Sequence, residues 1–143
     1  MAQINPYLIF NGNCEEAFTF YKSVFGGEFA LMSKYKDMPP ADGSKIADTD
    51  AERIMHVSYP IGKNAILLGG DANAQSGDVI FGNNVHVSMN TESEEEAKKI
   101  FEGLSNGGTI TMPLEKTFWG AYFGMCIDKF GINWMVNYDY PKE

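Results

Sequence analysis

The sequence predicts an α+β fold made of two tandem βαβββ modules. One observation is that a strand, a glycine-containing turn and a second strand occur twice, over residues 54–71 and 118–139, and overlie one another after a shift of 68. Another is that a short strand followed by a capped helix also occurs twice, after a shift of 80. These repeats indicate a single domain over residues 1–143, with module one over 3–71 and module two over 83–139.

Module one opens with a predicted strand and helix. Residues 4–10 form an apolar run, and Pro6 is tolerated near its start because proline is accepted at the beginning or edge of a strand. Asn13 is the expected helix cap, with Glu16 three residues later in a capping-box arrangement. The apolar face of the helix follows at helical spacing: Ala17, Phe20, Tyr21 and Val24. Gly26 and Gly27 are expected to end it.

The rest of module one reads as three strands and a long loop. Residues 28–35 predict a strand, and residues 53–59 and 64–70 predict a hairpin. The polar stretch over 36–52 contains two adjacent prolines and a glycine, so it is expected to be a loop. Residues 71–82 are the expected linker between the modules.

Module two repeats these signals. Residues 84–90 overlie 4–10, Ser93 overlies Asn13, Glu96 overlies Glu16, and Gly107 overlies Gly27. Residues 109–112 predict the next strand, and the aromatic-rich hairpin over 118–139 completes the module. The shift changes from 80 to 68 because module two lacks about a dozen residues of the long loop.

Composition excludes several classes of partner. The net charge of -8 disfavours nucleic acid and anionic membranes, which are recognised by excess lysine and arginine. No apolar run approaches the ~20 residues needed to span a bilayer, and the first ten residues lack the features of a secretory signal. A cytoplasmic location is therefore expected. Two cysteines, Cys14 and Cys126, argue against a disulfide scaffold.

Three stretches resemble the PhnB-like branch of the vicinal oxygen chelate superfamily, which includes glyoxalase I, bleomycin-resistance proteins and extradiol dioxygenases. They are PYLIFNGNCEEAFTFYKSVFGGE, TFWGAYFG and DKFGINWMVN, at matching places along the chain. The resemblance implies the glyoxalase/bleomycin-resistance fold, in which the modules form a cupped mixed sheet around a pocket, commonly within a homodimer. Members of this branch are sometimes labelled 3-demethylubiquinone-9 3-methyltransferase. The glycine-rich loop of a methyl-donor site is absent from this sequence.

The superfamily usually binds a divalent metal through four strand residues. The resemblance and the internal repeat carry these positions to Pro6, Leu67, His86 and Met135. Of the four, only His86 can bind a hard or borderline divalent ion, and one imidazole is a poor basis for a site that needs three or more protein ligands. No cofactor is therefore expected, although a slip of a residue or two would bring other polar groups closer.

The aromatic hairpin supplies the expected ligand site. Its aromatic residues either line a pocket or pack in the core, and strand alternation places about half of them on each side. The face that carries Met135 is expected to look into the pocket, with Asn137 or His86 supplying the polar contacts. The predicted ligand-binding residues are Trp119, Phe123, Met135, Asn137, His86 and Leu67.

Two functions follow from these residues. The first is a dimeric protein that binds an apolar or aromatic small molecule and lacks the usual metal tetrad. The alternative is a metal-dependent or histidine-dependent lyase, isomerase or dioxygenase of the same superfamily. In the second case His86 is the candidate catalytic residue, because an imidazole exchanges protons near neutral pH. An equally open interpretation is that His86 is a half-buried structural histidine.

Overall fold

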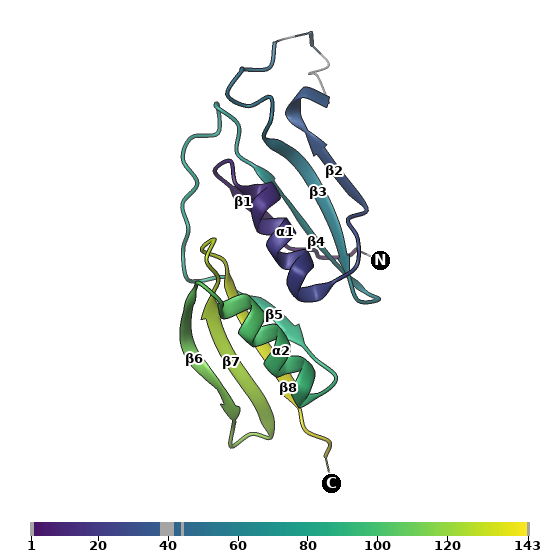
Figure 1. Ribbon diagram of the computed structural model, residues 1–143, viewed down its shortest axis with the longest axis vertical. Helices are drawn as coiled ribbons and strands as arrows, with labels where there is room; N and C mark the ends of the chain where they lie inside the picture. The colour runs from purple at the N-terminus through teal and green to yellow at the C-terminus, as the bar shows by residue number, and fades with distance from the viewer. Residues whose placement is uncertain (1, 38–41, 44, 143) are drawn as a thin grey trace. The chain divides into compact units, whose positions relative to one another are not determined.

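Two four-stranded mixed sheets, each with one helix, make up the protein, as the computed structural model shows (Figure 1). The structure describes residues 2–37, 42–43 and 45–142. The chain divides into two compact units, Met1–Ile80 and Phe81–Glu143. None of the described helices is long and apolar enough to cross a membrane.

The first unit contains β1 (Tyr7–Phe10), α1 (Cys14–Phe25), β2 (Leu31–Lys34), the short 3-10 helix η1 (Tyr35–Asp37), β3 (Ile54–Ile61) and β4 (Ala65–Asp71). The strand order is β1-β4-β3-β2. β1 runs parallel to β4, whereas β3 is antiparallel to both β2 and β4. The parallel pair is possible because the chain between β1 and β4 is long enough for a crossover.

The second unit has the same topology. It contains β5 (Val87–Asn90), α2 (Glu94–Ser105), β6 (Thr109–Lys116), β7 (Ala121–Ile127) and β8 (Asn133–Asp139). The strand order is β5-β8-β7-β6, with β5 parallel to β8. The two tandem βαβββ modules predicted from the sequence are therefore confirmed.

Each helix covers one face of its own sheet (Figure 1). Glycines in the sheets allow the helices to approach closely. A Cβ added at Gly69 of β4 would lie 2.5 Å from the Phe18 ring of α1. A Cβ added at Gly124 of β7 would lie 2.8 Å from the Phe101 ring of α2. The two cores form at these helix-covered faces, where Phe18 in one unit and Trp134 in the other are fully buried.

The helix starts differ between the modules. The capping box predicted in module two is present, because Ser93 Oγ accepts a hydrogen bond from Glu96 N at 3.0 Å. Asn13 is the N-cap residue of α1, as predicted, but its side chain makes no capping hydrogen bond, so the predicted capping box is not formed there. Instead, the carboxylate of Asp71 accepts hydrogen bonds from Gly12 N at 2.8 Å and Cys14 N at 3.0 Å.

Several predicted strand ends also move. The first strand begins at Tyr7, so Pro6 precedes it, and β6 extends to Lys116 beyond the predicted end at Met112. The last hairpin begins at Ala121. Phe118 and Trp119 therefore lie in the turn before β7 and not on a strand, since Gly120 turns the chain there with φ of 89°.

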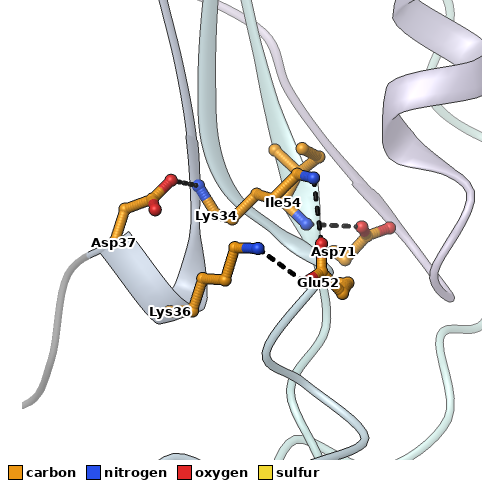
Figure 2. Close-up of polar contacts among 6 residues, drawn as sticks. All are labelled: Lys34, Lys36, Asp37, Glu52, Ile54 and Asp71. Carbon is orange, nitrogen blue, oxygen red and sulfur yellow. Dashed lines mark hydrogen bonds and ion pairs between the residues drawn. The ribbon is translucent and has the colours of Figure 1, made fainter.

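The predicted loop over 36–52 is partly ordered by polar contacts. Lys34 Nζ and Lys36 Nζ both pair with the Glu52 carboxylate, at 3.0 and 2.6 Å, and Lys34 N donates to Asp37 Oδ2 (Figure 2). Residues 38–41 and 44 of this loop lie outside the described residues. These contacts connect the two ends of the loop.

Candidate functional site

The face of the second sheet opposite α2, called the open face below, carries most of the predicted site residues. Paired residues on adjacent strands point to the same side of a sheet, and neighbours along a strand point to opposite sides. Gly124 faces α2 and pairs with Val136, which is fully buried. Phe123 and Met125 therefore belong to the open face.

One row of the open face crosses all four strands. Asn90 on β5 pairs with Asn137 on β8, Asn137 pairs with Phe123 on β7, and Phe123 pairs with Glu115 on β6. The Nδ2 of Asn137 donates to Asn90 Oδ1 at 3.0 Å and to Asp139 Oδ1 at 3.1 Å. These two bonds hold the amide in place at the centre of a polar cluster beside the Phe123 ring.

A second row lies beside the first and is rich in methionine. Ser88 pairs with Met135, Met135 with Met125, and Met125 with Met112. Methionine side chains are flexible and polarisable, so they adapt to apolar ligands of different shape. The open face therefore combines an adaptable apolar surface with a polar row that contains one aromatic ring.

Trp119 extends this surface from the turn before β7. Its ring lies 6.1 Å from the Phe123 ring in an edge-on arrangement, and 58% of the residue is exposed. Phe118 also contacts Trp119, at 5.0 Å between ring centroids, and is 98% exposed. The structure thus brings together Trp119, Phe123 and Asn137, three of the predicted ligand-binding residues.

His86 immediately precedes β5, two residues before Ser88. Its Nε2 lies 3.0 Å from the carbonyl oxygen of Asn83. A carbonyl oxygen only accepts, so Nε2 carries the hydrogen of this contact, and Nδ1 is the acceptor nitrogen of the neutral ring. Nδ1 is buried and has no hydrogen-bond partner among the described residues.

The placement of Leu67 corrects the repeat alignment. Leu67 is buried, with 2% exposed, and shares the helix-covered face with Gly69, so it does not correspond to Met135 on an open face. Tyr7 pairs with Leu68 as Ser88 pairs with Met135. The equivalent of Met135 is therefore Leu68, because a slip of one residue reverses the face of a strand.

The positions implied for a metal do not fit a divalent ion. Pro6 has no donor side chain, Leu67 is in the core, and the thioether of Met135 is a soft ligand. Within residues 2–37, 42–43 and 45–142, no three His, Cys, Asp or Glu side chains gather closely enough to hold a metal. Only His86 among the four positions offers a ligand of the usual kind.

Charge on the open face is acidic. Glu115 and Asp139 both occupy strand positions on this face. The described lysines of the second unit lie elsewhere: Lys98 and Lys99 on α2, Lys116 opposite Tyr122 with its Nζ over the Tyr140 ring, Lys129 in the β7–β8 turn, and Lys142 beyond β8. No described lysine therefore occupies an open-face strand position of this sheet.

The two cysteines are free and buried. Burial, with the nearby carboxylates of Asp71 and Glu15, raises the pKa of the Cys14 thiol well above its ordinary value. Burial and the carboxylate of Asp128 raise the pKa of Cys126 to about 11. Both thiols are therefore protonated near neutral pH, and neither is an activated nucleophile.

Sequence reasoning missed Asn90, Glu115, Met112 and Met125 as members of this face. Alternation along the last hairpin, counted from Phe123, identifies Met125, whereas Asn90 and Met112 are placed on this face only by the pairing of β5 and β6 with the hairpin. The predicted β6 ended at Met112, so Glu115 fell outside every predicted strand.

Known proteins share this architecture. The profile of the Glyoxalase/Bleomycin resistance protein/Dioxygenase superfamily matches residues 3–136. Protein YjdN of Escherichia coli strain K12 is 32% identical over 143 residues, covering 94% of this chain and 93% of YjdN.

Two solved structures are similar to this chain over almost their whole length. Protein PA1353 from Pseudomonas aeruginosa is 40% identical with a TM-score of 0.85, covering 97% of this chain and 98% of that one. The PhnB protein from Bacillus cereus is 25% identical with a TM-score of 0.76, covering 96% and 99%. The chain belongs to the Glyoxalase/Bleomycin resistance protein/Dioxygenase superfamily and, within it, to the PhnB-like branch.

Proposed function

We propose that the protein binds an apolar or aromatic small molecule on the open face of the second sheet. The observation that carries the proposal is the register that places Phe123 between Asn137 and Glu115, directly beside the row containing Met135 and Met125. Such a surface offers apolar area for most of a ligand and a few polar groups that fix its orientation.

The aromatic groups support a flat ligand in particular. Trp119 is more than half exposed and lies edge-on to Phe123, so a planar ligand can contact one ring or both. The Asn137 amide is held by two hydrogen bonds and therefore loses little freedom when a ligand binds.

The proposal includes a homodimer in the cytoplasm that works without a metal. The superfamily to which the chain belongs supports the dimer, and two free buried thiols are compatible with a reducing compartment. The donor chemistry of Pro6, Leu67 and Met135 supports the absence of a metal. Sedimentation of the purified chain tests the dimer, and elemental analysis of protein purified without a chelating tag tests the metal.

The test of ligand binding is a thermal-shift screen of flat aromatic compounds, followed by calorimetry on the compounds that raise the melting temperature. Replacement of Phe123 by Ala should weaken binding about tenfold, since it removes the ring at the centre of the surface. The matched control is Phe130→Ala, at the tip of the same hairpin. Equal binding by the wild type and Phe123→Ala would show that the ligand does not use this face.

The alternative function is a His86-dependent enzyme, and one observation favours it. The buried Nδ1 of His86 has no hydrogen-bond partner among the described residues, and such groups are uncommon in folded proteins. This nitrogen could take a proton from a bound substrate. Turnover of a thioester or a catechol that is lost in His86→Asn, with ligand binding retained, would establish this function over simple binding.

A further inference from the structure

Two acidic residues lie around Phe123 on the open face. Glu115 is the direct cross-strand neighbour of Phe123 on β6, and Asn137 is its neighbour on β8. Asp139, two residues along β8, shares the same face and accepts a hydrogen bond from Asn137. The ring is therefore flanked by carboxylates on two neighbouring strands.

We infer that the open face binds an aromatic or apolar molecule that carries a positive charge, such as an amine or a guanidine. A cation over an aromatic ring is attracted by the negative face of the ring, and Phe123 and Trp119 offer such rings. The carboxylates of Glu115 and Asp139 add direct attraction. This inference rests on the proposed function, since it names the class of ligand for the same face.

Within the second unit, the described lysines occupy no strand position on the open face. Lys116 is the next residue after Glu115, but it pairs with Tyr122 on the helix-covered side, and its Nζ lies 5.6 Å from the centre of the Tyr140 ring. Lys129 lies in the hairpin turn, with its Nζ 5.5 Å from the centre of the Phe130 ring. A bound cation would thus be the positive partner of Glu115 and Asp139, whereas an anion would meet like charge.

The hydrogen-bonding groups of the open face also favour a cationic ligand. The two donors of the Asn137 amide nitrogen are directed to Asn90 Oδ1 and Asp139 Oδ1. The carboxylates of Glu115 and Asp139 only accept when ionised. A ligand with N–H donors fits this row better than one with only acceptors. The methionine row of Met112, Met125 and Met135 receives the apolar body beside the charged group.

Calorimetry with three probes of one shape tests the inference on the full-length protein: naphthylmethylamine, which is cationic, naphthalenemethanol, which is neutral, and naphthoate, which is anionic. The amine is expected to bind about fivefold more tightly than the alcohol, and naphthoate most weakly. The preference should shrink as salt is added, because exposed charges are screened.

Two conservative variants locate the charge. Glu115→Gln and Asp139→Asn should each weaken binding of the amine roughly two- to fivefold, as for exposed ion pairs, and leave the alcohol unchanged. The control is Glu102→Gln on α2, an exposed glutamate on the helix-covered side. It should leave all three affinities unchanged.

The outcomes separate the two proposals. If the alcohol binds as tightly as the amine, or if both variants affect all probes equally, the charge inference is overturned. The proposed function still holds in that case when Phe123→Ala weakens every probe. If none of the probes binds, or binding does not depend on Phe123, then the proposed function on this face fails and the charge inference fails with it.

Discussion

The carboxylate of Asp71, at the end of β4, caps the start of α1 through the backbone nitrogen of Cys14. Its Oδ1 accepts from Cys14 N and Gly12 N. Its Oδ2 accepts from Ile54 N at 2.9 Å (Figure 2). One buried side chain, with 3% exposed, thus joins the first helix to β3 and β4. Negative charge at a helix start is also favoured by the helix dipole.

Replacing Asp71 with Asn should destabilise the first unit by about 3 kcal/mol, because an amide cannot accept all three bonds and places its own donors against backbone donors. The measurement is urea unfolding followed by far-UV circular dichroism. Asp48→Asn, at an exposed site, is the control and should change the free energy of unfolding by less than about 0.5 kcal/mol. Equal midpoints for the two variants would rule out the capping role.

Gly108 is a second position where the fold depends on one residue. A Cβ there would lie 2.1 Å from the carbonyl oxygen of Ile127, which is backbone and cannot move aside as a flexible side chain would. Gly108→Ala should therefore cost about 3 kcal/mol of stability. At Gly82 the nearest atom to an added Cβ is Asn84 Oδ1, at 3.4 Å. Gly82→Ala should be almost neutral in the same unfolding experiment, and similar losses for both variants would contradict this explanation.

Cys126 should make stability depend on alkaline pH. Its pKa is about 11 in the folded protein, against an ordinary value of 9.0. The unfolded thiol ionises first as the pH rises, so this contribution to stability is complete below about pH 9 and is lost between about pH 9 and 11, by on the order of 2 kcal/mol.

The comparison is the free energy of unfolding of wild type and Cys126→Ala across this pH range. The variant is less stable at neutral pH, but its stability should fall less steeply above pH 9, because no thiol ionises at this position. Parallel curves would show that Cys126 does not contribute to the alkaline loss.

The repeats predicted the architecture because each module carries its own local signals. Caps, glycines and apolar spacing are short-range, so Ser93 with Glu96 and the terminating Gly26 could be identified directly. The cap of α1 could not, since Asp71 lies far along the chain from Cys14 and reaches it only through the pairing of β1 with β4. Asn13 occupies the predicted N-cap position, but its side chain makes no capping hydrogen bond.

The sequence predicted which residues belong to the candidate site better than it predicted on which face of the sheet each residue lies. Phe123, Met135 and Asn137 were assigned to one hairpin and share the open face. Leu67 was carried over from Met135 with a one-residue error, because the 68-residue shift that overlays the two hairpins does not determine which face of the sheet each strand residue lies on. Glu115 was missed because irregular pairing of β6 with β7 lets the strand continue past Pro113.

The two tryptophans allow a direct test of the site surface in solution. Trp134 is fully buried and its Nε1 donates to Asp128 Oδ2 at 2.8 Å, whereas Trp119 is 58% exposed beside Phe123. Acrylamide should therefore quench part of the fluorescence readily, and this part should disappear in Trp119→Phe. A ligand on the open face should shield the same part in the wild type. Quenching that is unchanged by Trp119→Phe would mean that Trp119 is not exposed on this surface. The open face would then lack the exposed aromatic ring beside Phe123.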